Sequence, residues 1–594
     1  MQREKAKKYI NYIVFPIILL LYPLMQCNIG VDVTDTGYSL GSYLFSSAQM
    51  GEKWVFFAFY LANVVGSMLT HLPFGQTMIG MNFYTGLFVS ATALISYYFL
   101  IRKIPAWIAL TGEFMAISLC WCPTVILYNY LTFFFFTIMV ICLYKGIMED
   151  KRIWLVCAGV VLGLSVMSRF PNITQAALII AVWYYGWLQK DNISNVLKNT
   201  GACILGFLIG MGAMLSIIAT QYGMESYFGM ISSLLSGEGS VEGHSLGDMV
   251  WPIIDAYFVA AKWFFFIIAV AVGGILLFMI LRDRFIIIKK VGYIITILVL
   301  FRFLYGRGMF NFRYYAYDSM FQWVAIFLIL SLISSAVIMA QKNTSLSDKT
   351  LACMTILIIA VTPIGSDNYL YMNMNNLFLV APLVLYWISL YVKGNRNPKI
   401  GRIEIERFPI TAILVMVIAV TLLQSVGFGF TFVFRDGTLG EKRDTRIYKN
   451  NVLYGMYTNR ENAETIEGIT EYCEQKQLQG KKVILYGDIP AMSCFLQMPA
   501  ALSTTWPDLA SYTIETMQKD IALIRQEQDS NDRPVIIVSS GFGAWLMEDL
   551  EEMNYFGISP EKYDNDEKAT LIRNLILDMQ YEQTYANSKF ALFE

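Results

Sequence analysis

Residues 5–38 read KAKKYINYIVFPIILLLYPLMQCNIGVDVTDTGY, and this stretch decides the class of the protein. Its lysines precede an apolar run from Tyr9 to about Met25, close to the length that a helix needs to cross a bilayer. No small-residue cleavage site follows the run, so we interpret it as a retained first span rather than a signal peptide. Asp32 and Asp35 come directly after this span and are therefore expected at the opposite face of the membrane.

The composition of the whole chain indicates a polytopic membrane protein. Of its 594 residues, 56% are hydrophobic and 15% are charged, whereas soluble chains are about 25% charged. On the criterion that a span needs about 20 mostly apolar residues, we predict about 13 transmembrane helices. They begin near Tyr9, Met78, Ala106, Val125, Ile153, Ile173, Gly201, Trp263, Val291, Ala316, Thr350, Asn376 and Pro409.

The distribution of charge predicts how the chain is oriented. With the N-terminus inside, every predicted inner loop carries Lys or Arg, as cytoplasmic loops do. Residues 430–594 hold 16 basic and 26 acidic residues, whereas residues 1–429 have a net charge of +9. We therefore predict a transmembrane domain over 1–429, with a cytoplasmic N-terminus, and an extracytoplasmic domain over 430–594. The net charge of the whole chain, -1, gives no indication of a nucleic-acid partner.

Two long outer loops, at 30–77 and 221–262, and a small C-terminal domain complete the predicted organisation. Residues 435–449 are polar and suit a linker. Beyond them, two β-type runs alternate with helical stretches, which predicts an α/β domain. The strand end Tyr486-Gly487-Asp488 lacks a GxGxxG continuation, so we interpret this domain as a covering or acceptor-binding module without chemistry of its own. The β-type runs are Val483–Tyr486 and Val535–Ser539, and the helical stretches are Asn462–Gln477, Ser511–Gln528 and Glu567–Met579.

The ionisable residues of the membrane domain gather at the outer ends of the spans. With two histidines and no CxxC pair among nine cysteines, the chain has no signature of histidine catalysis, zinc or an iron–sulfur cluster. The spans are nearly free of charge, and Glu113 is the main exception. An ion-driven transporter places such groups near the midplane of the membrane. The pattern therefore favours chemistry at the outer surface.

The segment Val31–Tyr38, followed by Tyr43, Gly51 and Trp54, resembles the first outer loop of the GT-C superfamily of membrane glycosyltransferases. This superfamily includes the protein O-mannosyltransferases and the lipid A aminoarabinose transferases. Its members carry an essential acidic residue just after the first span, then an aromatic-containing interfacial helix, a Gly and a Trp. This chain differs in having Thr36 where a second acid is common, and it lacks the Trp-Trp-Asp signature of oligosaccharyltransferases.

The resemblance implies a GT-C-like membrane domain in a bacterial plasma membrane and an inverting transfer of a hexose or pentose. The donor would be a polyprenyl-phosphate sugar and the acceptor a lipid, glycan or protein outside the membrane. A divalent metal ion is a further candidate as a cofactor.

In such a reaction one carboxylate, Asp35 or Asp32, takes the proton of the acceptor hydroxyl as the anomeric carbon is attacked. The lipid phosphate leaves without a proton, but its growing negative charge must meet a cation. Arg307 and Arg313 are the first candidates because the planar guanidinium fits phosphate oxygens. Arg169 and Lys53 are further phosphate-binding candidates, and Tyr38, Tyr43, His71, His244, Asp367 and Asn368 are substrate-binding candidates.

Each of these interpretations has a simpler alternative. Asp35 precedes a predicted helix, where an aspartate commonly serves as the N-cap. Arg307 and Arg313 would equally anchor a span at the lipid headgroups, and Asp367 lies in a predicted turn. For the whole protein, the alternatives are a transporter or flippase of lipid-linked precursors, in which Glu113 would act, and a non-catalytic membrane assembly protein.

Overall fold

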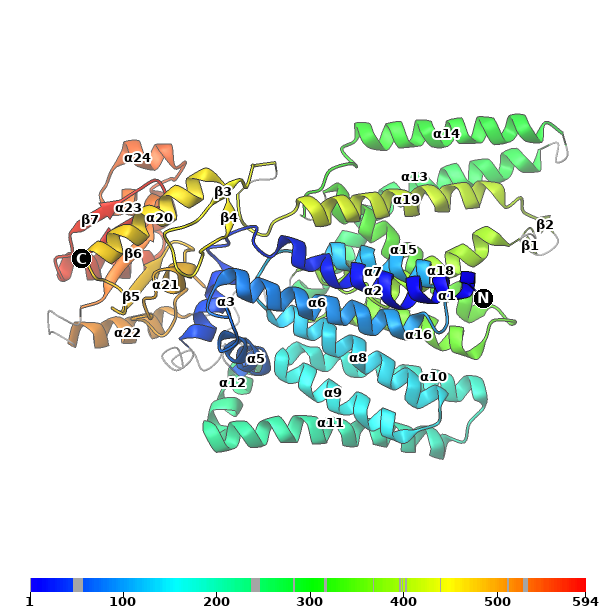
Figure 1. Cartoon of the computed structure of the whole chain (residues 1–594), viewed down its shortest axis with the longest axis horizontal. Helices are drawn as coiled ribbons and strands as arrows, with labels where there is room; N and C mark the ends of the chain where they lie inside the picture. The colour runs from blue at the N-terminus through cyan, green and yellow to red at the C-terminus, as the bar shows by residue number, and fades with distance from the viewer. Residues whose placement is uncertain are drawn as a thin grey trace.

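A bundle of apolar helices forms the body of the protein, and a small α/β domain covers one end of it (Figure 1). The computed structural model describes residues 2–45, 57–236, 246–280, 284–314, 318–366, 368–394, 397, 399–400, 403–437, 440–509, 512–526 and 533–594. Within these ranges, seven helices are long and apolar enough to cross a membrane, accompanied by three shorter apolar helices. The predicted class, a helical membrane protein with a small C-terminal α/β domain, is confirmed.

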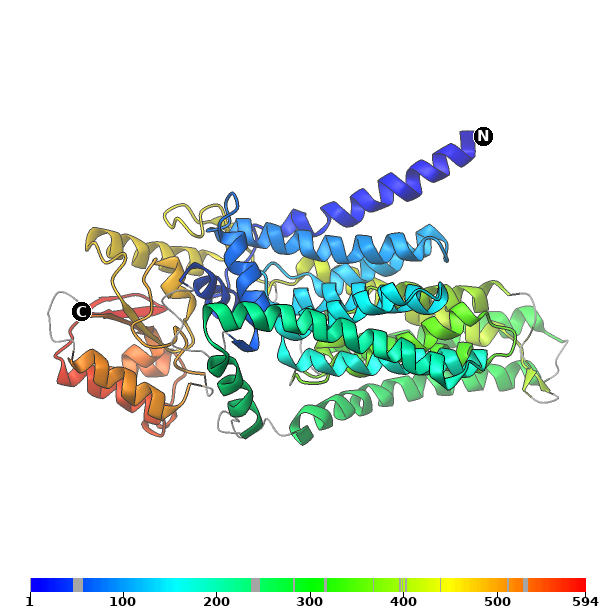
Figure 2. The same ribbon diagram turned by 90° about the horizontal axis from the view of Figure 1, so that it is seen from below.

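The N-terminus and the C-terminal domain lie at opposite ends of the bundle (Figure 1). The first helical segment leaves the bundle at an angle, as Figure 2 shows. The segments of the bundle are α1 (Gln2–Tyr9), η1 (Ile10–Val14), α2 (Phe15–Leu21), η2 (Pro23–Gln26), α6 (Met78–Leu100), α7 (Ala106–Cys120), α8 (Tyr128–Met148), α9 (Arg152–Ser168), η3 (Phe170–Ile179), α10 (Ile180–Gln189), α11 (Ile193–Gln221), α13 (Leu246–Met279), α14 (Ile286–Gly306), α15 (Ser319–Ala340), α16 (Leu346–Val361), α17 (Tyr371–Asn375), α18 (Val380–Lys393), the short strands β1 (Lys399–Ile400) and β2 (Ile403–Glu404), and α19 (Phe408–Thr431).

A helical segment lies near every predicted span start, and the largest difference is at α13. This helix begins at Leu246 rather than near Trp263, and α12 (Met224–Ser236) precedes it. The predicted outer loop 221–262 is therefore largely helical. The candidate span in this helix already begins at Val250. The charges of Asp255 and Lys262 had indicated a loop, because they interrupt a segment that is otherwise mostly apolar.

Glycines let α9 and α11 pack with their backbones in close approach. A Cβ at Gly159 would lie 2.0 Å from the Cys203 carbonyl oxygen, and one at Gly206 would lie 2.0 Å from the Val156 carbonyl oxygen. Small residues spaced by four drive helix association in lipid, where apolar side chains gain nothing by leaving the membrane. These contacts fix the arrangement of two neighbouring spans.

The C-terminal domain contains a four-stranded sheet of order β5-β6-β8-β7. β5 pairs with β6 in parallel, and β8 runs antiparallel to both β6 and β7. The elements are β3 (Thr445–Arg446), β4 (Tyr457–Thr458), α20 (Arg460–Gln475), β5 (Val483–Tyr486), α21 (Ala491–Phe495), α22 (Ile514–Gln526), β6 (Val535–Ser539), α23 (Ser540–Leu546), α24 (Leu550–Tyr555), α25 (Glu561–Asp564), α26 (Glu567–Asp578), β7 (Gln583–Ala586) and β8 (Phe590–Phe593). Both predicted strands have the predicted bounds. The expected linker 435–449 is instead packed into the domain, because Asp436 and Ile447 are fully buried.

The loop after the first predicted span contains α3 (Asp35–Leu44) and α5 (Tyr60–Thr70), and it is bound to the C-terminal domain through backbone hydrogen bonds. The Gly30 N–H donates to the Tyr457 carbonyl at 2.8 Å, and the Tyr457 N–H donates to the Asn28 carbonyl at 2.8 Å. The Ala491 N–H donates to the Val33 carbonyl at 3.0 Å. These bonds lie on both sides of Asp32 and just before Asp35, so the start of the loop and the domain are positioned as one unit.

Candidate active site

A cavity of about 880 Å³ lies where the helix bundle meets the C-terminal domain. Its walls come from α3, α5, the start of α8, α17, the segment after α19, and the C-terminal domain. Aromatic rings of the membrane domain, including Phe59, Phe133 and Phe432, line much of it. Asp35, Arg435 and Asp488 add charge at the side of the C-terminal domain. The cavity therefore joins an apolar part with a small charged group.

The Asp35 carboxylate forms an ion pair with Arg435. The Arg435 Nη1 lies 3.0 Å from Asp35 Oδ2 and donates to Thr34 Oγ1 at 2.9 Å. The Asp35 side chain is 38% exposed and that of Arg435 is 51% exposed, so both face the open cavity. An ion pair this exposed contributes little to stability. Its effect is to hold the carboxylate and the guanidinium together at the wall of the cavity.

The surroundings of Asp35 raise its pKa to about 6. Loss of hydration is the main cause, the positive charge of Arg435 opposes it, and the negative charges of Asp32 and Asp488 add to it. A carboxylate with a pKa near 6 is deprotonated at neutral pH and still accepts a proton more readily than an ordinary aspartate. These are the properties that a general base requires.

Asp32 lies three residues before Asp35, and its carboxylate is hydrogen-bonded to the start of α3. It is buried, and its carboxylate accepts hydrogen bonds from the Thr34 N–H (2.8 Å), the Thr34 hydroxyl (2.6 Å) and the Thr36 N–H (2.8 Å). These bonds satisfy backbone groups at the start of α3 that lack partners within the helix. Asp35 is the first residue of that helix rather than its cap. The geometry thus assigns the capping contacts to Asp32 and leaves Asp35 at the cavity.

Aromatic residues connect α3 with the C-terminal domain across the cavity. The Tyr38 ring packs edge-on against Trp506, with centroids 5.6 Å apart. The Trp506 indole N–H donates to Asp488 Oδ1 at 3.0 Å, so this ring fixes a second carboxylate at the same wall. Tyr43 also lines the cavity and donates its hydroxyl to the Ile126 carbonyl at 2.6 Å. Tyr38 and Tyr43, both predicted as substrate-binding residues, are therefore brought together with Asp35.

The other predicted residues divide into three groups. Asn368 lines the cavity, and Arg169 lies behind it, 5.5 Å from the ring centroid of the lining residue Tyr128. Of the described predicted residues, Arg307, Arg313 and His71 are not part of the cavity wall: Arg307 stacks on Phe303, the Arg313 backbone N–H donates to Asn311, and His71 contacts the Ser67 carbonyl. Lys53, His244 and Asp367 lie outside the described residues.

Arg435 and Asp488 were missed by the sequence interpretation. Arg435 was assigned to a linker, although in the predicted orientation a positive charge just beyond the last span runs against the usual bias and was a usable signal. Asp488 was discounted because its strand end lacked a dinucleotide motif. Nothing in the sequence brings residue 488 next to residue 35, since that contact depends on how the domain docks.

Two further predictions concern metal binding and Glu113. The described part of the chain contains no group of three or more His, Cys, Asp or Glu side chains placed to hold a metal ion. Glu113 is fully buried in α7 and is not part of the cavity wall.

No family model and no curated protein sequence matches the chain. The solved structures similar to it include the Archaeoglobus fulgidus oligosaccharyltransferase in complex with Zn and sulfate, with 10% identity over 90% of this chain and 69% of that chain and a TM-score of 0.46. The arabinosyltransferase EmbB of Mycobacterium smegmatis is 12% identical over 71% of this chain and 42% of its own, with a TM-score of 0.32. Both TM-scores lie below 0.5, and the function proposed below rests on the geometry of the cavity.

Proposed function

We propose that the chain is a GT-C-type membrane glycosyltransferase that moves a sugar from a polyprenyl-phosphate donor to an extracytoplasmic acceptor. The observation that carries this proposal is the Asp35–Arg435 pair at a cavity between apolar helices and a polar domain. The resemblance of residues 31–54 to the first outer loop of that superfamily supports it. With the N-terminus in the cytoplasm, the cavity lies at the outer face of a bacterial plasma membrane.

Asp35 serves as the general base of this reaction. Its carboxylate takes the proton of the acceptor hydroxyl while the oxygen attacks the anomeric carbon of the donor. The bond between that carbon and the phosphate oxygen breaks, and the electron pair leaves with the phosphate. Attack from the face opposite the leaving group inverts the anomeric configuration.

Arg435 meets the charge that develops on the leaving phosphate. A guanidinium has five N–H donors, so it can hold Asp35 and a phosphate oxygen at the same time. The aromatic rings at the membrane side of the cavity suit the first isoprene units of the donor, since these units are apolar. Arg307, Arg313, Arg169 and Lys53 stay as predicted phosphate contacts.

The test is transfer of labelled sugar in membranes that contain the full chain. The donors are a panel of polyprenyl phosphates carrying radiolabelled hexoses or pentoses, and the variant is Asp35→Asn. Loss of a general base typically lowers a rate by about 10²–10⁴. The matched control is Asp191→Asn, because Asp191 is an exposed residue between α10 and α11, away from the cavity. Wild-type rates in Asp35→Asn would overturn the proposal.

A further inference from the structure

A second cavity has a volume of about 620 Å³. It is lined by Val31 and Val33 of the first loop, by Arg435, and otherwise by residues of the C-terminal domain. It is placed at the carboxyl ends of the parallel strands β5 and β6. Such strand ends commonly form ligand crevices, because the connections that leave them diverge. At the end of β5 the chain turns through Gly487 (φ +97°), where a Cβ would lie 2.1 Å from Ser539 Oγ. A glycine at this point lets the two strand ends form one continuous floor.

The lining of this second cavity is polar and electrically balanced. It contains three carboxylates and three cationic side chains. Hydroxyls of Ser539, Ser540 and Ser588 and the amide of Asn462 also lie in the lining. The balance of charge disfavours a highly charged ligand, and the polar groups disfavour an apolar one. The carboxylates are Asp488, Asp508 and Asp566, and the cations are Arg435, Lys562 and Lys589.

Carboxylates only accept hydrogen bonds and ammonium groups only donate them, so a ligand that satisfies both must do both itself. Hydroxyl groups have this property. The rings of Tyr563 and Phe556 in the same lining offer apolar faces to the C–H groups of a sugar ring. A neutral, hydroxyl-rich ligand, such as the end of a glycan chain, matches this combination.

The second cavity is adjacent to the first, because Asp488 and Arg435 line both of them. The charges of both residues also act on Asp35. A ligand seated over β5 and β6 would therefore lie next to the residues that surround the reacting carboxylate. In the proposed reaction the donor is a lipid, which the aromatic lining of the first cavity suits, whereas the polar lining of the second cavity suits an acceptor that is not a lipid.

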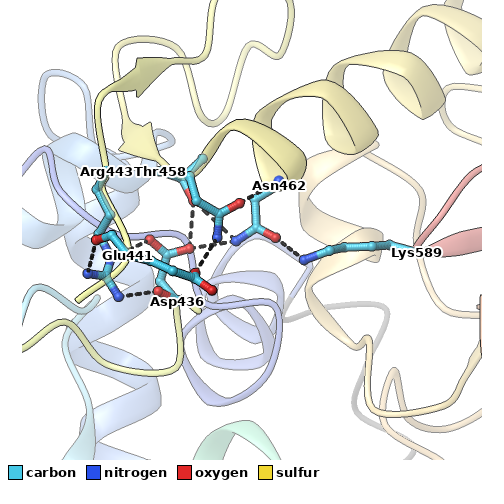
Figure 3. A network of polar contacts seen from close by, with 7 residues as sticks. Asp436, Glu441, Arg443, Thr458, Asn462 and Lys589 are labelled. Atoms are coloured by element: carbon cyan, nitrogen blue, oxygen red, sulfur yellow. Dashed lines mark hydrogen bonds and ion pairs between the residues drawn. The ribbon is translucent and has the colours of Figure 1, made fainter. Parts of the chain in front are cut away.

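A network of polar residues around the buried Asp436 reaches Asn462 and Lys589, which line the second cavity (Figure 3). Lys589, in the lining, donates to Asn462, and the Asn462 amide donates to Asp436 Oδ1 at 2.7 Å. Asp436 is fully buried and also accepts from the Thr458 hydroxyl at 2.6 Å and Arg443 Nε at 3.0 Å. Asp436 directly follows Arg435 in the chain. The network thus fixes Arg435 and the floor of the second cavity relative to each other, as a pre-organised site requires.

We propose that this second cavity binds the acceptor and that the acceptor is the hydroxyl-rich end of a neutral glycan. This inference rests on the proposed function. The acceptor hydroxyl forms the new bond to the anomeric carbon, its proton passes to Asp35, and the bond to the donor phosphate breaks with its electron pair on the phosphate.

The test separates donor activation from acceptor binding. In membranes with their own acceptors and the panel of labelled polyprenyl-phosphate sugars, label is measured both in polymer and as free sugar released by water. Lys562→Gln, Asp508→Asn and Ser588→Trp alter the second cavity without touching Asp35. Each should lower the ratio of polymer label to free sugar by about tenfold, as the loss of a polar contact or of access to the cavity implies. Thr584→Trp, on the exposed strand β7, is the matched bulky control.

The outcomes distinguish the two proposals. An unchanged ratio in all three variants, each with the melting temperature of the wild type, overturns the acceptor site. A labelled product that protease releases as small fragments shows a protein acceptor and overturns the glycan assignment, whereas resistance to protease and release by glycosidases supports it. If the wild-type chain turns over no donor at all, neither to polymer nor to water, the failure lies with the glycosyltransferase function itself.

Discussion

Arg435 Nη1 lies 3.0 Å from Asp35 Oδ2. Arg435, which follows the last span, therefore forms an ion pair with Asp35, which follows the first span. Asp488 faces the same carboxylate from the C-terminal domain and has the opposite electrostatic effect on it. Two neighbours therefore adjust one pKa in opposite directions. The assignment of Asp35 as the base can therefore be tested by the direction in which the pH dependence of transfer shifts, and not only by loss of activity.

The pH dependence of transfer should move in opposite directions in two variants. Wild-type activity falls as pH drops through about 6, because the base becomes protonated. Arg435→Gln removes a charge that lowers the pKa of Asp35, so its acidic limb shifts to higher pH. Asp488→Asn removes a charge that raises this pKa, so its limb shifts to lower pH. The measurement is the initial rate from pH 4.5 to 8, and shifts of equal sign in both variants would contradict the assignment.

The melting temperature should show how far the ionised Asp35 carboxylate destabilises the folded protein. Its pKa in the folded protein, about 6, lies above the ordinary value of 3.8, so the folded state binds more protons than the unfolded state between these values. Stability therefore falls as pH rises through this window. Asp35→Asn has no charge and should melt above the wild type at pH 7.5, with a difference that shrinks toward pH 4. A difference independent of pH would show that the Asp35 carboxylate is not destabilised by burial.

Gly37 sets the distance between α3 and α21. A Cβ at this position would lie 2.0 Å from the Ala491 Cβ and 2.7 Å from its Cα, so the two helices must separate in Gly37→Ala. Overpacking of this kind typically costs about 1–3 kcal/mol. We expect a lower melting temperature together with a loss of transfer, because α3 carries Asp35. Gly212→Ala is the matched control, since a Cβ there meets nothing within 4 Å. Equal behaviour of the two variants would exclude tight docking of α3.

Asp32 should tolerate a change that Asp35 does not. Asp32→Asn keeps one of the two oxygens, which can still accept from the Thr34 N–H and hydroxyl, and loses only the acceptor of the Thr36 N–H, so transfer should fall less than in Asp35→Asn. Asp32→Ala leaves both N–H groups without this acceptor and should cost about 0.5–2 kcal/mol of stability. Thermal unfolding and transfer rates of the three proteins check this. Loss of transfer in Asp32→Asn as large as in Asp35→Asn would instead make Asp32 the base.

The sequence predicted those features that depend on short stretches of chain. Apolar runs located the helices of the bundle, and the β-branched runs at 483–486 and 535–539 located two strands, because the patterns of burial are local. The first-loop aspartates were also found locally. Arg435 and Asp488 became visible only in the structure, since their relevance comes from contacts between residues far apart in sequence. The helix at 246–262 was missed because Asp248, Asp255, Lys262 and Pro252 interrupt its apolar pattern, and such residues are also typical of a loop.

The hydrogen bonds between Tyr457 and residues 28 and 30 have a consequence for biogenesis. During synthesis, the first loop is translated long before the segment that contains Arg435, Tyr457 and Asp488. Until that segment has been translated and has folded, Asp35 lacks its guanidinium partner and α3 lacks the surface against which it packs. A nascent chain, or one truncated before residue 457, would insert its helices but would lack the complete proposed site around Asp35. Transfer activity would therefore require that the C-terminal domain has been synthesised and has docked.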